Sequence, residues 1–171
     1  MKGKKCFLAL LLCVFLFSAN ALSVSFQLVQ KDFSQNEIRA ASYVIEDSMF
    51  EYFFDKGIVV SNLPILIYKN ENASDLALIN SVGESRLGGI NYLVSLCAEY
   101  DVSNSTNPEA VSLDNISNIS WKIINIDTDE VVTKGEEKKN DVQKKSNKKD
   151  ALESFSYLVA QKIYNSIRSN M

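Results

Sequence analysis

The stretch of this sequence that most restricts its fold runs from residue 90 to residue 100. Large apolar side chains occur on both faces of its first half. Ile90, Tyr92, Val94 and Leu96 share one face, and Leu93 lies on the other. A strand with one face in water alternates cleanly between apolar and polar residues, whereas a strand buried on both faces does not. We therefore predict a largely buried strand over 90–100, inside a sheet covered on both sides.

Segments before this strand supply part of the cover. Residues 23–30 alternate as a first strand does, and Ser34 and Glu37 have the spacing of a capping box. Apolar residues then recur at steps of three and four, so we predict a long amphipathic helix over 35–56 that ends at Gly57.

A second strand is predicted at 58–60, directly after this helix. Pro64 interrupts its continuation, so residues 65–68 are expected at an edge or a bulge, or outside the sheet, because proline cannot donate to a strand ladder. A shorter helix should follow, capped by Asn72 or Ser74. Its apolar positions, before Gly88 and Gly89 end it, are Leu76, Ile79, Val82 and Leu87.

The C-terminal half continues with a hairpin and a closing helix. Strands are predicted at 121–126 and 130–134, with a turn between them, and an amphipathic helix at 150–168. Two polar segments, near 104–118 and 136–149, are expected to be mobile loops, the first of the long kind that is usually functional. The prediction is one α/β domain over 22–171, a three-layer α-β-α arrangement with a mixed sheet in the order β-α-β-α-β-β-β-α.

The first 21 residues have the pattern of a secretory signal peptide. A basic start precedes an apolar run, and Ala19 and Ala21 are the small residues that signal peptidase recognises. The alternative, a retained transmembrane anchor, needs roughly 20 apolar residues, and the run is shorter. Cys13 lies inside the run and not just after it, which disfavours a lipid anchor. We predict a periplasmic or secreted protein after cleavage.

The amino-acid composition restricts the catalytic, metal-binding and nucleic-acid-binding functions open to this chain. The chain contains no histidine, and removal of the signal peptide leaves one cysteine, Cys97, and a net charge of about −6. No spacing typical of a catalytic triad, a zinc site or a phosphate-binding loop occurs. We therefore predict no catalytic, cofactor-binding or metal-binding residues, no cofactor, and no nucleic-acid partner. Contact with a membrane is expected only through export or a weak peripheral association.

Three segments resemble the domain shared by periplasmic accessory proteins of the CsgG and LpoB type, which is also similar to the N-terminal domain of TolB. The segments are a glycine-to-strand step at 57–60, a glycine-led strand at 88–94, and the hairpin at 122–132. The resemblance implies a protein that is not an enzyme and that binds other envelope proteins. Members activate a cell-wall synthase, such as a penicillin-binding protein, or build secretion pores. The apolar hairpin used for pores has no counterpart in this chain.

The functional hypothesis is therefore an exported, non-enzymatic accessory or activator protein that docks on an unidentified envelope protein through exposed loops. Its oligomeric state stays open. One alternative is a periplasmic protein that binds or hydrolyses a small ligand, which a buried pair of acidic residues in a deep pocket would favour. Another is a secreted eukaryotic protein, because Asn-x-Ser/Thr sequons occur at Asn72, Asn104, Asn115 and Asn118.

Overall fold

The computed structural model describes residues 21–139 and 148–171. The predicted signal peptide, including Ala19, therefore lies outside the described residues, except for Ala21, which is exposed. Most of the predicted loop at 136–149 also lies outside them. Within the described part, no helix is both long enough and apolar enough to span a bilayer.

A single mixed sheet forms the middle of the domain. Its strands are β1 (Ser23–Lys31), β2 (Val59–Asn62), β3 (Leu66–Ile67), β4 (Tyr92–Tyr100), β5 (Ile116–Asn125) and β6 (Val131–Lys138). Their order is β2-β1-β4-β5-β6, with β3 also paired to β1. Strand β1 pairs in parallel with β2, β3 and β4. The pairs β4–β5 and β5–β6 are antiparallel.

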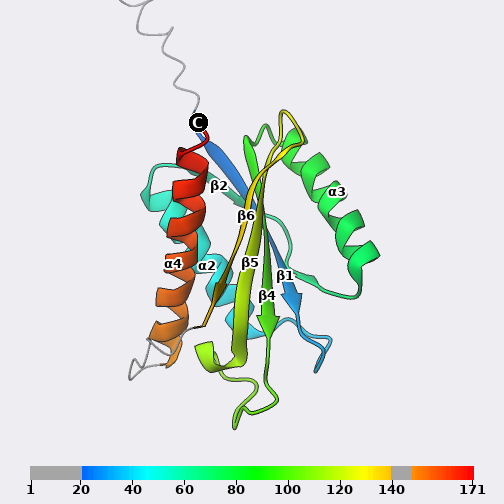
Figure 1. The fold of residues 1–171 in the computed structure, drawn as a ribbon, viewed down its shortest axis with the longest axis vertical. Coiled ribbons are helices and arrows are strands. Elements are labelled where there is room, and N and C mark those ends of the chain that lie inside the picture. The colour runs from blue at the N-terminus through cyan, green and yellow to red at the C-terminus, as the bar shows by residue number, and fades with distance from the viewer. Residues whose placement is uncertain (1–20, 140–147) are drawn as a thin grey trace, which may run out of the picture.

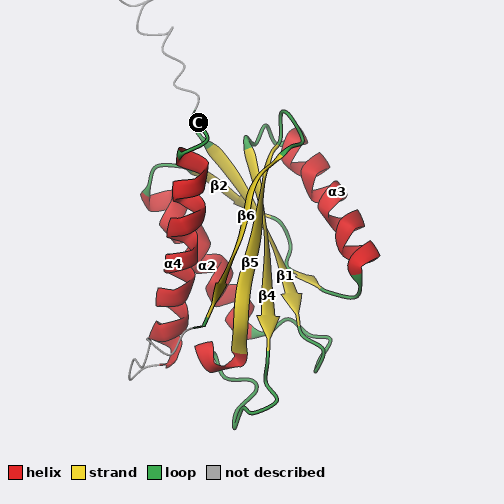
Figure 2. Cartoon of the chain, in the orientation of Figure 1, coloured by secondary structure: helices red, strands yellow, loops and turns green. Residues whose placement is uncertain are grey.

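Helices cover both faces of this sheet. They are α2 (Ala40–Asp55), α3 (Glu71–Leu87) and α4 (Lys148–Arg168), and a short 3-10 helix, η1 (Leu113–Asn115), precedes β5. Helices α2 and α4 pack side by side on one face, and α3 lies on the other (Figures 1 and 2). The predicted α/β class and three-layer arrangement are confirmed, and so is the element order except for the added two-residue strand β3 between β2 and α3.

The central position predicted for residues 90–100 is also confirmed. Strand β4 lies between β1 and β5, and it begins at Tyr92. Val94 and Leu96 belong to the large core beneath α2 and α4, whereas Leu93 belongs to a smaller cluster on the α3 face. This strand is thus buried on both faces, as its lack of clean alternation indicated.

The predicted start of the long helix is wrong by five residues. Helix α2 begins at Ala40, and the side chain of its N-cap residue, Arg39, makes no capping hydrogen bond. Ser34 does not form the predicted capping box, because its backbone N and its Oγ both donate to Oδ1 of Asp32. The segment between β1 and α2 is therefore folded around Asp32 and is not helical.

Two other boundaries differ from the prediction. Strand β5 begins at residue 116, so the end of the predicted 104–118 loop is strand, in which Ile116 and Ile119 are buried. The cap of α3 is neither Asn72 nor Ser74 but Asn70, whose side chain accepts from the backbone N of Ala73. Strand β3, after Pro64, is the two-residue edge pairing that the proline allows.

Candidate functional site

The long loop between β4 and β5 lies at the end of the sheet where the parallel strands β1 and β4 finish. Strands β1 and β4 are parallel, so their carboxyl ends meet at one end, at the bottom of Figure 1. In open α/β sheets ligands bind outside the carboxyl ends of the strands. We call residues 101–115, which leave β4 at this end, the 101–115 loop.

Arg39 ties the 101–115 loop to the body of the domain. Its Nε donates to Oδ2 of Asp32, just after β1, over 2.5 Å. Its Nη1 donates to the backbone oxygen of Pro108, at 2.6 Å, and to Oε1 of Glu109, at 3.0 Å. The planar guanidinium presents several donors in fixed directions. One buried side chain therefore joins the end of β1, the start of α2 and the loop.

The charge of Asp32 is stabilised in this position. Burial raises the pKa of its carboxyl, but hydrogen bonds from Ser34 and from Arg39, together with the positive charge of Arg39, outweigh burial and hold the pKa below its usual value. The carboxylate is therefore ionised at neutral pH, and it compensates the charge of a buried arginine.

Gln30, near the end of β1, orients Arg39 from the other side. Its Oε1 accepts from the backbone N of Arg39, at 2.7 Å, and from Oγ of Ser42, at 2.9 Å. Its Nε2 donates to the backbone oxygen of Glu37 at 2.8 Å. Ser42 also shares a hydrogen bond with Tyr100, at the end of β4, and burial raises the pKa of this tyrosine to about 12. The glutamine side chain thus fixes the start of α2, although it accepts from Arg39 itself and not from the first-turn amides that a cap would satisfy.

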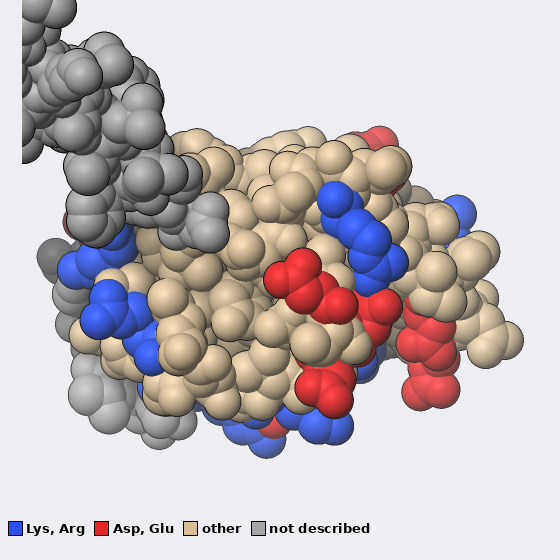
Figure 3. Space-filling view, turned by 90° about the horizontal axis from the view of Figure 1, so that it is seen from above, with Lys and Arg blue, Asp and Glu red and all other residues tan. Residues whose placement is uncertain are grey.

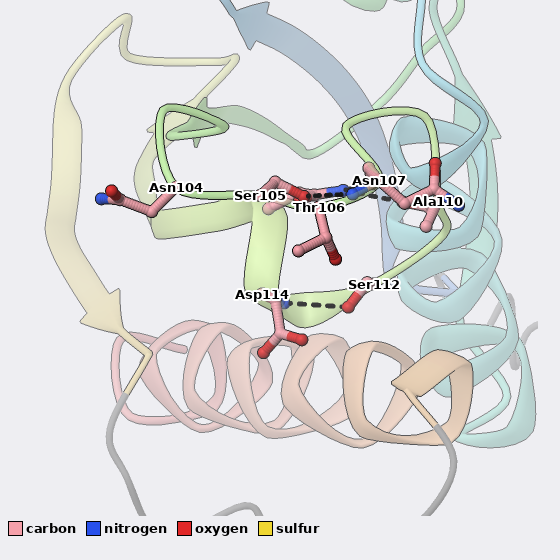
Figure 4. A pocket seen from close by; sticks show the side chains of 8 residues that line it. Asn104, Ser105, Thr106, Asn107, Ala110, Ser112 and Asp114 are labelled. Carbon is pink, nitrogen blue, oxygen red and sulfur yellow. Dashed lines mark hydrogen bonds between the residues drawn. The ribbon is translucent and has the colours of Figure 1, made fainter.

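The 101–115 loop encloses a polar hollow of about 270 Å³, here called the loop pocket (Figure 4). Its lining is made of amide, hydroxyl, methyl and carboxylate groups, from Asn104, Ser105, Thr106, Asn107, Ala110, Ser112, Asp114 and Asn115. Inside the loop, Oγ of Ser112 accepts from the backbone N of Asp114 at 3.1 Å. The lining contains neither aromatic nor basic side chains.

Asn115 holds the loop in its closed shape. Its side chain is buried, and Nδ2 donates to the backbone oxygens of Asn107, Pro108 and Ala110 at 3.0–3.2 Å. Its Oδ1, by contrast, is buried without a hydrogen-bond partner in the described part of the chain. A sequon asparagine in this position cannot carry a glycan without opening the loop, because its amide nitrogen already makes these bonds.

The described residues show no assembled catalytic or metal centre. No group of three or more acidic or cysteine side chains in residues 21–139 and 148–171 is close enough to hold a metal ion. Asp32 is the one buried acidic side chain among them. Cys97, on β4, is half-buried, and burial raises the pKa of its thiol, so it stays protonated and unreactive at neutral pH.

The opposite end of the domain has a different surface. Seen from above in Figure 3, Lys and Arg side chains lie next to Asp and Glu side chains, and much of the surface between them is uncharged. Arg86 of α3 pairs there with Asp129 in the β5–β6 turn, where Asp129 has a positive φ of 60°. Such paired surface charges form no field of a single sign that would attract a charged polymer.

Sequence reasoning found the loop but not its anchors. Of the predicted signal-peptidase residues, Ala19 lies outside the described residues, and Ala21 is exposed and takes no part in this arrangement. Arg39 and Asp32 were missed, because charged residues near a helix start are ordinarily exposed. The available signal was local: an aspartate directly after a buried strand, with an arginine seven residues later.

A model of the protein family described as "Uncharacterised protein" matches residues 23–168. The chain belongs to this family. No protein with a curated description matches the sequence. The match to the family spans every strand and helix that the structure describes.

Several solved structures are similar to this chain at low identity. The PelC dodecamer from Paraburkholderia phytofirmans has 14% identity and a TM-score of 0.49, over 81% of this chain and 84% of that chain. TolB from Acinetobacter baumannii has 10% identity and a TM-score of 0.46, over 86% and 28%. The LpoB C-terminal domain from Salmonella enterica has 12% identity and a TM-score of 0.35, over 68% and 82%.

These neighbours include two of the protein types that the sequence resembles, TolB and LpoB. The chain spans little more than a quarter of TolB. Such identities and TM-scores carry no function with them, and kinship with the CsgG type stays a prediction.

Proposed function

We propose that this protein is an exported, non-enzymatic interaction protein of the bacterial envelope, which docks on another envelope protein through the 101–115 loop. Export is proposed from the basic and apolar pattern that ends at Ala19 and Ala21. The narrower role of a penicillin-binding protein activator is proposed from the resemblance in sequence alone.

The observation that carries the docking proposal is the anchoring of the loop by Arg39. A loop tied to a rigid scaffold by buried, charge-assisted hydrogen bonds keeps its shape before the partner arrives. Little conformational entropy is then lost on binding, so more of the contact energy appears as affinity.

The absence of histidine supports a function without turnover. Acid–base catalysis would fall to other side chains, such as carboxylates and thiols. Asp32, the one buried acid in the described ranges, is held ionised by its partners, and burial keeps the thiol of Cys97 protonated. The buried acidic pair that would favour a hydrolase is not found there. Binding through shape and hydrogen bonding is the function that these residues support.

The test compares two double variants of an affinity-tagged chain. Asn104→Lys with Thr106→Lys places two long cations on the exposed rim of the loop pocket. The control, Asn62→Lys with Thr128→Lys, makes the same chemical change at exposed positions on β2 and in the β5–β6 turn. The loop variant should lose the partner recovered from the native envelope, whereas the control should retain it. Equal recovery of that partner by both variants contradicts docking through this loop.

The deletion that the sequence suggested, residues 104–118, is not a suitable test. It removes Leu113, Asn115 and Ile116, which are buried, together with the first strand residues of β5. Loss of binding in such a deletion would report unfolding, because core residues are removed along with the loop. Substitutions at exposed positions avoid this.

The loop pocket favours a second candidate function, the binding of a small ligand. The unpartnered Oδ1 of Asn115 is an acceptor, and a buried acceptor without a donor costs about 1–3 kcal/mol. A hydroxyl or ammonium donor would satisfy it, but this oxygen is buried, so a ligand in the pocket must displace part of the loop to reach it. Thermal unfolding with N-acetylglucosamine or free lysine tests this candidate. A rise in midpoint that is absent in Thr106→Lys supports it, and unchanged midpoints with both compounds contradict it.

A further inference from the structure

Helix α3 presents its apolar side to solvent. Leu76, Ile79 and Leu87, three of the four apolar positions predicted for this helix, are 60%, 67% and 91% exposed. The side that faces the sheet carries the fourth, Val82, with Leu78, both packed against the small core cluster, and the buried Ser81 and Ser85. Oγ of Ser81 donates to Oε1 of Gln27 on β1 at 2.7 Å. Exposed apolar patches of this kind mark interaction sites on soluble proteins.

Gly83 completes the exposed side. At 3.6 residues per turn, Leu76, Ile79, Gly83 and Leu87 form one stripe along α3. Nothing in residues 21–139 and 148–171 requires glycine here, because a Cβ added to Gly83 would meet no atom of these residues within 4 Å. Glycine in a helix interior costs about 1 kcal/mol relative to alanine. A glycine in an apolar stripe allows another helix to approach closely, and such a contact would offset this cost.

We propose that the outer stripe of α3 binds a second copy of this chain, with the two helices antiparallel. The stripe is self-complementary in this orientation. When the two copies of α3 cross near Ser81, Leu76 of each lies opposite Leu87 of the other. Ile79 of each then enters the space left by Gly83 of the other. The contact is isologous, so the assembly closes at two copies.

The charges beside the stripe select the same orientation. Asp75, in the first turns of α3, and Arg86, in its last turn, lie on the same flank of the stripe. An antiparallel pair brings Asp75 of each copy beside Arg86 of the other, because equal flanks of the two stripes then face each other. In a parallel pair this flank faces the opposite flank of the partner, so these charges form no pairs across the contact. Arg86 makes its contacts with Asp129 and with the backbone oxygen of Ile126 through one nitrogen, Nη2. The guanidinium has further N–H donors for a second carboxylate.

The size of the contact predicts its strength. From Leu76 to Leu87 the stripe is about 16 Å long and, at a helix width of about 10 Å, it covers on the order of 160 Å². This area is small beside the roughly 800 Å² per partner of a stable interface. The dimer should therefore dissociate on dilution, and its mass should depend on concentration.

The first test measures the mass of the full chain by sedimentation equilibrium over a range of concentrations. We expect a monomer–dimer equilibrium, which Ile79→Glu weakens at least tenfold, because it buries a carboxylate opposite Gly83. The matched control is Phe54→Glu, an exposed apolar residue on α2, which should leave the equilibrium unchanged. A monomer at all concentrations overturns the proposal, and so does a dimer that Ile79→Glu leaves intact.

The second test separates self-association from effects on folding. Asp75→Arg and Arg86→Asp should each weaken the dimer, and the double variant should restore it, because the charge pairs re-form in reverse. A mixture of the two single variants should form a heterodimer preferentially. Gly83→Ala should raise the unfolding temperature of the monomer and yet weaken the dimer. Failure of the double variant to restore dimerisation, with both folds intact, overturns the antiparallel arrangement.

Discussion

The Nε of Arg39 donates to Oδ2 of Asp32 over 2.5 Å, between side chains that are 4% and 2% exposed. Ion pairs this deeply buried add little net stability, because the desolvation of both charges offsets their attraction. Their use is to fix geometry. In this protein the fixed geometry is that of the 101–115 loop, because the other end of the guanidinium holds the backbone of Pro108.

Removal of Arg39 alone should be strongly destabilising. Arg39→Met leaves the Asp32 carboxylate buried without its charged partner, and such a change costs about 3–5 kcal/mol. Urea unfolding at neutral pH measures this loss. The double variant Asp32→Leu with Arg39→Met should recover most of it. A loss below about 1 kcal/mol in Arg39→Met would show that the pair does not hold the fold together.

Glu109 pairs with the same guanidinium as Asp32, but from an exposed position. Its carboxylate accepts from Nη1 of Arg39 at 3.0 Å, but its side chain is 72% exposed. Exposed ion pairs contribute little, so Glu109→Ala should change the free energy of unfolding by less than about 1 kcal/mol. The same urea experiment checks this value. A loss as large as that of Arg39→Met would place the anchoring at Glu109 and not at Asp32.

The stability of the domain should fall in acid through Asp32. The pKa of this carboxyl is lower in the folded protein than its ordinary value of 3.8, so the unfolded chain takes up the proton first. Its contribution to stability is complete above that ordinary value and is lost as the pH falls through the lower, folded value. Urea midpoints from neutral pH to about pH 2 should therefore decline less steeply in Asp32→Asn than in the natural sequence. Parallel declines would contradict the assignment.

Ser85 should be a site where a single substitution stabilises the protein. Its Oγ is buried against the sheet without a hydrogen-bond partner in the described part of the chain. Ser85→Ala removes this hydroxyl and introduces a better helix former, so we expect a gain of about 1 kcal/mol. Ser81→Ala, one turn earlier, should instead lose stability, because its Oγ is bonded to Gln27. Thermal unfolding of the two variants checks the difference in sign.

A side chain at position 135 should destabilise the protein, because Gly135 lies against the ring of Trp121. It lies opposite Trp121 in the β5–β6 ladder, and a Cβ at this position would stand 2.5 Å from the indole ring. Gly135→Ala therefore forces the ring or the strand to move, at a cost of about 1–3 kcal/mol. Trp121 is the only tryptophan in the sequence, so its fluorescence reports the movement directly. An unchanged spectrum and midpoint would contradict the close packing.

Much of the fold followed from local pattern. Apolar residues on both faces of 90–96 predicted the central strand, and Pro64 predicted the edge. The capping box failed because Asp32, just after β1, accepts from Ser34, and Gln30, on β1, accepts from the backbone of Arg39. The sequence pattern of the helix start does not reveal these contacts.

The site was less predictable than the fold. A polar loop of unusual length could be recognised from composition, but its anchor depends on Arg39 reaching a residue 69 positions away. The orientation of α3 was misjudged for a similar reason. Val82 faces the sheet as expected, but Leu76, Ile79 and Leu87 do not, because the side that packs on the sheet also carries Ser81, which is bonded to Gln27.

The central claim is that the anchored 101–115 loop is the surface that meets a partner. Site-specific photo-crosslinking in the native envelope tests it most directly, with the probe at Thr106, on the loop, or at Thr128, in the turn at the other end of the sheet. We expect one discrete adduct with an envelope protein from position 106 and none from position 128. Adducts from both positions, or from position 128 alone, would contradict the proposal.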